Sequence, residues 1–229
     1  MERGLYIAAS GMLAEQVRQN QIANDLANSS TPGYKADRSS QQGFGDLLLQ
    51  NSATGQTVGS LGMGVTIAKT TTDLSAAPVR DTGEPLDFAI EGDGFFQIRT
   101  AQGSRFTRNG QFMRSSAGLL TDALGNPVLS QNGGTITVNA DGTVPSGSIG
   151  VFNVTNARKA GDALFTGTAN GTATGTVRSG ALEGSGTDPA QSMVEMIASY
   201  RAYEAGQKVI RTIDETLNKA VTQVPSING

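Results

Sequence analysis

Glycine is concentrated in the middle of this chain, and its distribution limits where long helices can form. Of the 30 glycines, two lie in residues 1–32, two lie in residues 189–229, and the other 26 lie in the 156 residues between. Glycine permits tight turns but lowers the stability of a helix. All eight phenylalanines also fall in the centre, between Phe44 and Phe165. The sequence therefore predicts an α+β protein with helices at both ends and a turn-rich β region between them.

The C-terminal segment has the clearest helical pattern. Pro189 follows Asp188, which is typical of the first helical position after an N-cap, and no proline recurs before Pro225. Apolar and aromatic residues then return at helical intervals and form a stripe on one side. The stripe consists of Met193, Met196, Tyr200, Tyr203, Ile210, Leu217, Val221 and Val224. The helix is predicted to span about 33 residues, or ~50 Å, which favours a coiled coil or rod.

A second helix is predicted from about Arg3 to Asn28, and Thr31-Pro32-Gly33 ends it. Neither terminal helix can bury its apolar face alone, so we expect the two to pair as a coiled-coil-like unit, with a second layer from other subunits. Residues 5–14 resemble a weak signal-peptide core, but no net positive charge precedes them. We therefore expect no cleaved secretion signal in this segment.

Composition divides the rest of the chain. We assign residues 1–33 to the N-terminal helix, 34–83 to an extended arm with one short strand or helical turn, 84–178 to a β domain, and 179–229 to a linker and the C-terminal helix. The threonine- and glycine-rich stretch 166–176 is predicted to be a surface loop or an edge strand. The predicted strands are 86–90, 95–99, 118–121, 135–138 and 149–154. Because Phe95 and Phe96 are adjacent in a strand, only Phe96 is expected in the core.

The composition excludes several functions. The chain has no histidine and no cysteine, which removes imidazole bases, thiol nucleophiles, disulfides and structural zinc. Its net charge of −3 argues against nucleic acid as a partner, and no stretch approaches the ~20 apolar residues of a membrane span. The glycines at 59–64 do not match a phosphate loop, and the carboxylates near 91–94 and 141 favour hairpin turns over a calcium site.

We expect no cofactor, no metal and no enzyme activity. A surface- or carbohydrate-binding β module without catalysis is the alternative to a filament subunit, and a hydrolase using paired carboxylates is a third class.

Several stretches, in this order along the chain, resemble flagellar basal-body rod proteins. The stretches include both ends and the middle, so together they are far more specific than any one motif. They are Gly4–Met12, Ile22–Lys35 (IANDLANSSTPGYK), Glu84–Gln97 (EPLDFAIEGDGFFQ), Phe106–Phe112 (FTRNGQF), Leu182–Ser185 (LEGS) and Met193–Leu217. Within this family the length and the single β domain resemble the distal-rod (G-type) or proximal-rod (F-type) subunits.

The resemblance implies a structural subunit that polymerises helically into the periplasm-spanning rod and transmits motor torque to the hook. It implies that the terminal helices form an inner tube and the β domain an outer layer. The implied partners are further copies of the chain, neighbouring rod and hook subunits, and the flagellar type III export apparatus, without insertion into a membrane. Asn24 and Asn28 suit either a helix end or an intersubunit hydrogen bond, whereas an interface is the better interpretation of Tyr200 and Tyr203. The expected subunit-interface residues are Leu5, Ala9, Met12, Ile22, Asn24, Leu26, Asn28, Met193, Met196, Tyr200, Tyr203, Ile210, Leu217 and Val221.

Overall fold

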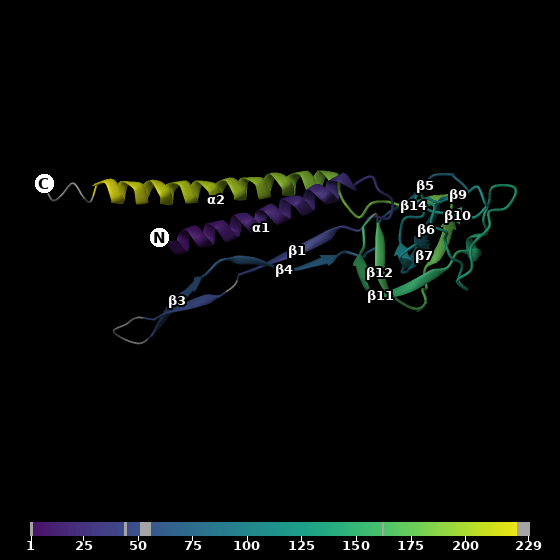
Figure 1. Cartoon of the computed structure of the whole chain (residues 1–229), viewed down its shortest axis with the longest axis horizontal. Helices are drawn as coiled ribbons and strands as arrows, with labels where there is room; N and C mark the ends of the chain where they lie inside the picture. The colour runs from purple at the N-terminus through teal and green to yellow at the C-terminus, as the bar shows by residue number, and fades with distance from the viewer. Residues whose placement is uncertain (1, 44, 51–55, 162, 224–229) are drawn as a thin grey trace. The chain divides into compact units, whose positions relative to one another are not determined.

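The computed structural model describes residues 2–43, 45–50, 56–161 and 163–223 (Figure 1). Val224 and Phe44 therefore lie outside the described residues. The elements are α1 (Glu2–Ala27), β1 (Asp37–Gly43), β2 (Asp46–Gln50), β3 (Thr57–Gly62), β4 (Val65–Thr72), β5 (Val79–Asp81), β6 (Phe88–Glu91), β7 (Phe95–Thr100), β8 (Gly103–Thr107), β9 (Met113–Arg114), β10 (Leu120–Thr121), the 3₁₀ turn η1 (Ser146–Ser148), β11 (Val151–Lys159), β12 (Leu164–Thr172), β13 (Thr176–Ser179), β14 (Ala181–Glu183) and α2 (Pro189–Gln223). The predicted terminal helices and β-rich centre are confirmed.

Contacts divide the chain into two units. Unit 1 comprises Met1–Leu26, Asp37–Thr71 and Pro189–Gly229, and unit 2 comprises Ala27–Ala36 and Thr72–Asp188. Unit 1 thus contains both helices and strands β1–β4, whereas unit 2 contains the remaining strands. The chain passes from one unit to the other four times.

In unit 1, α1 and α2 lie side by side and run in opposite directions (Figure 1). The Ser199 hydroxyl donates to a carboxylate oxygen of Glu15 over 2.6 Å. A Cβ added to Gly206 would lie 2.7 Å from Met12 Cγ, and one added to Gly4 would lie 3.3 Å from Ile213 Cδ1. These three contacts show that the two helices are antiparallel. Gly206 permits the close approach, since any larger residue would displace Met12.

The segment between the helices of unit 1 contains more strand than the sequence predicted. Instead of one short strand or helical turn, β1 pairs with β4 and β2 pairs antiparallel with β3. The backbone N–H of Val65 donates to the Ser10 hydroxyl, and the Gln41 amide donates to Glu15, so this ribbon contacts α1. Strand β1 reads DRSSQQG and is mostly exposed. It buries no apolar face, so it has no hydrophobic alternation by which the sequence could reveal it.

Unit 2 is built around a small closed barrel of strands in the order β11-β12-β8-β7. Three further strand pairs, β13–β6, β14–β5 and β10–β9, complete the unit. Two of the predicted strands need correction: residues 135–138 form only isolated bridges, and the strand expected over 118–121 is reduced to β10. The Gly/Thr stretch lies largely in β12, whose residues beyond Phe165 pair with β11 alone. An edge strand is therefore the correct one of the two alternatives for most of that stretch.

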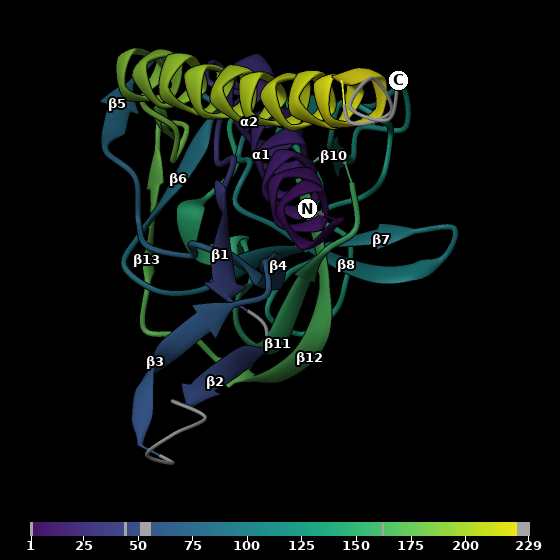
Figure 2. The ribbon, with the colours of Figure 1, turned by 90° about the vertical axis from the view of Figure 1, so that its left-hand side faces the viewer.

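Both faces of β7 are covered, contrary to the sequence prediction for Phe95. Phe96 is fully buried in a large cluster that includes Phe112, with 5.3 Å between their ring centroids. Phe95 is 5% exposed and packs in a second cluster with Phe106 and Phe165. The closed barrel explains the difference: Phe95, Phe106 and Phe165 come from its strands β7, β8 and β12 (Figure 2) and form one cluster, while Phe96 packs in the other cluster on the opposite face of β7.

We therefore expect Phe95→Ala and Phe96→Ala both to lower the free energy of unfolding of unit 2 by about 3–5 kcal/mol, because each leaves a cavity in a packed cluster. Urea unfolding of the full chain measures this. Met113→Ala, at a side chain that is 47% exposed, serves as the control and should change stability by less than about 0.5 kcal/mol. A Phe95→Ala variant as stable as this control would contradict the two-cluster core.

Candidate assembly interface and buried charge cluster

An apolar row lies on the solvent side of α1. Tyr6, Leu13 and Val17 are spaced by seven and four residues, so they share one side of the helix. Their exposed fractions are 57%, 63% and 46%. Residues Gly4, Met12 and Glu15, which contact α2, lie on other sides of α1. We call Tyr6, Leu13 and Val17 the α1 stripe.

A second apolar surface lies on the first turns of α2. Met193, Val194, Ile197 and Tyr200 are each more than half exposed, and their spacing places them together. Ser199, Gly206 and Ile213, which contact α1, lie on a different side of α2. Beyond Tyr200 the side of the patch carries charged residues such as Glu204 and Lys208. We call the four apolar residues the α2 patch.

The structure distributes the expected interface residues over different environments. Met193, Tyr200, Val221 and Asn24 are exposed. Ile22 is buried, and the others are half-buried: Leu5, Ala9, Met12, Leu26, Asn28, Met196, Tyr203, Ile210 and Leu217. The described residues of the C-terminal stripe spread around part of the helix circumference. Some of them are therefore exposed and others half-buried, so the stripe is not one uniform surface. The side-chain oxygen of Asn28 accepts a hydrogen bond from the Thr31 hydroxyl, and its backbone carbonyl accepts one from the Ser185 hydroxyl. Such bonds are typical of a residue at the end of a helix.

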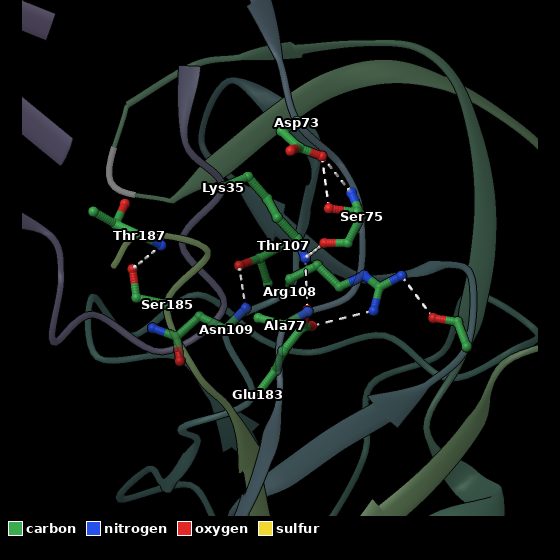
Figure 3. A network of polar contacts seen from close by, with 11 residues as sticks. Lys35, Asp73, Ser75, Ala77, Thr107, Arg108, Asn109, Glu183, Ser185 and Thr187 are labelled. Carbon is green, nitrogen blue, oxygen red and sulfur yellow. Dashed lines mark hydrogen bonds and ion pairs between the residues drawn. The ribbon is translucent and has the colours of Figure 1, made fainter. Parts of the chain in front are cut away.

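Unit 2 contains a buried cluster of three charged side chains (Figure 3). Lys35, Arg108 and Glu183 come from positions far apart in the chain, and their side chains are at most 3% exposed. Lys35 Nζ lies 2.6 Å from Glu183 Oε1, and an Arg108 guanidinium nitrogen lies 3.1 Å from Glu183 Oε2. The backbone N–H of Ala77 also donates to the Glu183 carboxylate. One carboxylate thus accepts three donors.

The two cations have further partners inside the unit. Lys35 Nζ donates to the Ser75 carbonyl over 2.6 Å, and Arg108 donates to the Gly92 carbonyl over 2.8 Å. The Arg108 guanidinium also lies 5.4 Å from the ring centroid of Phe95. Burial lowers the pKa of Lys35, and the hydrogen bond and charge of Glu183 oppose that lowering. The cluster therefore bonds five segments of unit 2 to one another, at residues 35, 75–77, 92, 108 and 183, with the Glu183 carboxylate at its centre.

Lys35 and Glu183 each lie shortly before a point where the chain leaves unit 2. Gly33 N–H donates to the Glu183 carbonyl, and Gly186 N–H donates to the Tyr34 carbonyl. Gly33 has a positive φ of 65°, and a Cβ there would lie 2.3 Å from the Arg108 carbonyl carbon. Only glycine fits at this position. The segment that follows α1 in the chain is thereby held against the segment that precedes α2.

Two adjoining grooves of about 420 and 220 Å³ lie on unit 2 and share Gln111 and Ala123. Among their lining residues Phe112 is the only aromatic, and it is buried, so the grooves present no exposed ring to a ligand. Across the described residues, no three acidic side chains gather closely enough to hold a metal ion. Neither described helix is long and apolar enough to cross a membrane.

Sequence reasoning missed the charge cluster and five of the seven exposed apolar residues of the α1 stripe and the α2 patch, because only Met193 and Tyr200 were expected at an interface. Lys35, Arg108 and Glu183 each lie in a stretch that carries the family resemblance, but no local pattern pairs charges that are 75 and 148 positions apart. Leu13 and Val17 could have been found from their spacing of four, had each side of α1 been considered separately.

Three protein families match this chain. Residues 5–35 match the family described as "Flagella basal body rod protein", residues 89–156 match "Flagellar hook protein FlgE/F/G D1 domain", and residues 178–223 match "Flagellar basal body rod FlgEFG protein C-terminal". The matches cover the helical ends as well as part of the β-rich centre.

Individual proteins match over nearly the whole length. The flagellar basal-body rod protein FlgG of Bacillus subtilis is 34% identical, and the alignment covers 96% of this chain and 98% of that protein. The flagellar hook-basal body complex protein FlhO of the same organism is 30% identical over 99% of this chain and 100% of that protein. The flagellar basal-body rod protein FlgF of Caulobacter vibrioides is 28% identical, with both chains fully covered.

The charge cluster predicts an asymmetry between two variants. Glu183→Gln removes the carboxylate that both buried cations contact, so we expect a loss of about 3–5 kcal/mol in the free energy of unfolding. Lys35→Met leaves Glu183 paired with Arg108 and should cost less. Chemical denaturation of both variants measures the difference.

The matched control is Asp81→Asn, which removes a carboxylate from the surface pair with Arg178. The Asp81 side chain is 72% exposed, so the change should cost less than about 1 kcal/mol. If Lys35→Met proved more destabilising than Glu183→Gln, Glu183 would not be the centre of the cluster.

Proposed function

Because the chain belongs to the flagellar basal-body rod protein family, G or F type, we propose that it polymerises helically into the rod that spans the periplasm and transmits motor torque to the hook. Members of this family are structural proteins of the flagellar basal body. The chain is accordingly a structural protein and not an enzyme.

The observation that carries the proposal is the pair of exposed apolar surfaces on the terminal helices. A soluble monomer rarely leaves a contiguous apolar surface facing water, and such surfaces mark contacts with other proteins. The α1 stripe and the α2 patch together contribute seven large apolar side chains to the surface of unit 1. Further copies of the chain and neighbouring rod and hook subunits are the proposed partners.

The helix pair is proposed to be coiled-coil-like. In support, Ser199, Gly206 and Ile213 approach α1 at intervals of seven residues, the repeat of a coiled coil. Strands β1–β4 are proposed to form the extended arm of the same unit. The strand pairs β1–β4 and β2–β3 support this, because a two-stranded ribbon is an extended form of the chain without a core of its own.

In the proposed rod, the helices of unit 1 form the inner tube and unit 2 forms the outer layer. Torque must then pass through the chain segments that connect the units. The buried charge cluster suits that task, since it fixes Lys35 and Glu183 near two of these connections. Unit 2 also has its own covered core, so it can face outward without needing further burial.

We further propose export through the flagellar type III apparatus without signal cleavage. Residues 5–14, which resemble a signal-peptide core, belong to α1, and Met12 packs against Gly206 of α2. They therefore have a role in the folded unit. The proposed location is the basal body within the cell envelope.

Assembly of the purified full chain tests the proposal. We expect sedimentation velocity to show polymers as concentration rises. Tyr200→Asp should abolish them, because a carboxylate buried in an apolar contact costs several kcal/mol in each subunit. The unfolding midpoint should not change, because Tyr200 is 56% exposed in the free chain. In cells, the same variant as the sole copy should abolish swimming.

Ala205→Asp is the matched control: it adds the same charge at an exposed position of α2 outside the patch. This variant should assemble like the unmodified chain. A chain that stays monomeric at every concentration, or swimming cells that contain only the Tyr200→Asp protein, would refute the proposed function.

A further inference from the structure

The segment Ala27–Ala36 belongs to unit 2, although the residues on both sides of it belong to unit 1. The chain therefore enters unit 2 at the start of this segment and leaves it again at the end, so a force on either adjoining part of unit 1 acts on the segment. Lys35 anchors the segment to Glu183 of β14 through the buried charge cluster. An anchor at one residue does not prevent the segment from rotating about that point.

A second side chain of the segment is held by a different strand. Tyr34 is 5% exposed, and the ammonium of Lys159, the last residue of β11, lies 4.3 Å from the centroid of its ring. The same nitrogen also donates to the Tyr34 hydroxyl over 3.3 Å. The face of an aromatic ring attracts a cation, and the attraction is stronger where water is excluded. This contact therefore joins the segment to β11.

The two anchors lie in different sheets of unit 2. Glu183 is in β14, which pairs with β5, whereas Lys159 is in β11 of the closed barrel. A body attached at one point can turn about it, but a second attachment elsewhere fixes its rotation. Resting on the proposed rod function, we propose that Tyr34 and Lys159 are positioning residues for torque transmission. They fix the rotation of segment Ala27–Ala36 relative to the barrel, so that a turning force on the segment reaches unit 2 without twisting the segment.

Three substitutions in β11 separate this role from general effects of charge or packing. Lys159→Met keeps an unbranched apolar side chain but removes the cation and the hydrogen-bond donor. Lys159→Arg keeps both, because a guanidinium also stacks on an aromatic face. Arg158→Met is the matched control, since it removes the same charge from the neighbouring, exposed position. We expect only Lys159→Met to release the segment.

Two backbone hydrogen bonds report whether the segment is held. Gly186 N–H donates to the Tyr34 carbonyl over 2.8 Å, and Asp73 N–H donates to the Ala36 carbonyl over 2.9 Å. An amide exchanges its hydrogen with water when its bond opens, so the exchange rate measures how often each bond is broken. In the purified full chain carrying Lys159→Met, both amides should exchange about ten times faster, as loss of a half-buried contact between a cation and a ring implies.

The Leu129 amide, which donates to a carbonyl of β7 inside unit 2, is the internal reference. Its exchange should not change, because Lys159 is in neither phenylalanine cluster. Lys159→Arg should keep the two reporter amides slow, and Arg158→Met should leave all three amides unchanged. Unchanged reporter amides in Lys159→Met would overturn the proposal. An equal acceleration at Leu129 would overturn it too, because it would show that unit 2 is destabilised as a whole.

Swimming under load tests the mechanical part of the proposal. Cells that contain only the Lys159→Met chain should swim like unmodified cells in dilute buffer, where the load on the motor is small. As the viscosity of the medium is raised, they should lose speed more steeply than unmodified cells, and Lys159→Arg should restore the normal dependence. If speed in Lys159→Met cells depends on viscosity as it does in Arg158→Met cells, the two residues have no role in torque transmission.

A strain that lacks the chain separates this inference from the proposed function. If that strain swims, the rod function is wrong and the positioning role fails with it. If the strain does not swim, but Lys159→Met changes neither the exchange of the reporter amides nor the dependence of speed on viscosity, only the positioning role is wrong.

Discussion

Unit 2 depends on the buried ion pairs that Glu183 forms with Lys35 and Arg108. The Glu183 carboxylate accepts hydrogen bonds from Lys35, Arg108 and the backbone of Ala77, and its side chain is 1% exposed. A buried carboxylate is costly unless its partners replace the water that it loses, and the same is true of each buried cation. Each buried charge therefore needs a partner of opposite sign, and Glu183 is that partner for both Lys35 and Arg108. The segments that carry these residues are thereby held together.

This requirement gives the cluster a role beyond stability. The chain crosses between its two units four times, and the unit 2 residues beside those crossings are bonded to one another. The Ser185 hydroxyl donates to Asn28, Gly186 N–H to Tyr34, and Asp73 N–H to Ala36. All four connecting segments are thus fixed in one region of unit 2. The proposed transmission of torque requires connections that do not shift independently, and these hydrogen bonds between the connecting segments suit that requirement.

Unit 1 follows a different physical rule. Its helices contact each other through small or polar positions such as Gly206 and Ser199, while several of their large apolar residues face solvent. That arrangement leaves apolar surface available to other copies. Unit 2 buries its phenylalanines in two clusters and keeps little for partners. The sequence already indicated this difference, because seven of the eight phenylalanines fall in the segments of unit 2.

The amino-acid sequence was sufficient to predict the terminal helices, the β-rich centre and the family. Helical periodicity and the position of glycine are local signals, so Pro189 and the stripe after it predict α2 without any knowledge of the fold. Three further facts became evident only in the folded chain: which side of each helix is exposed, that Phe95 is buried as well as Phe96, and that Lys35 contacts Glu183. Local patterns cannot encode these facts. Burial of Phe95 depends on closure of a barrel, and the charge cluster depends on segments as many as 148 positions apart being brought together by folding.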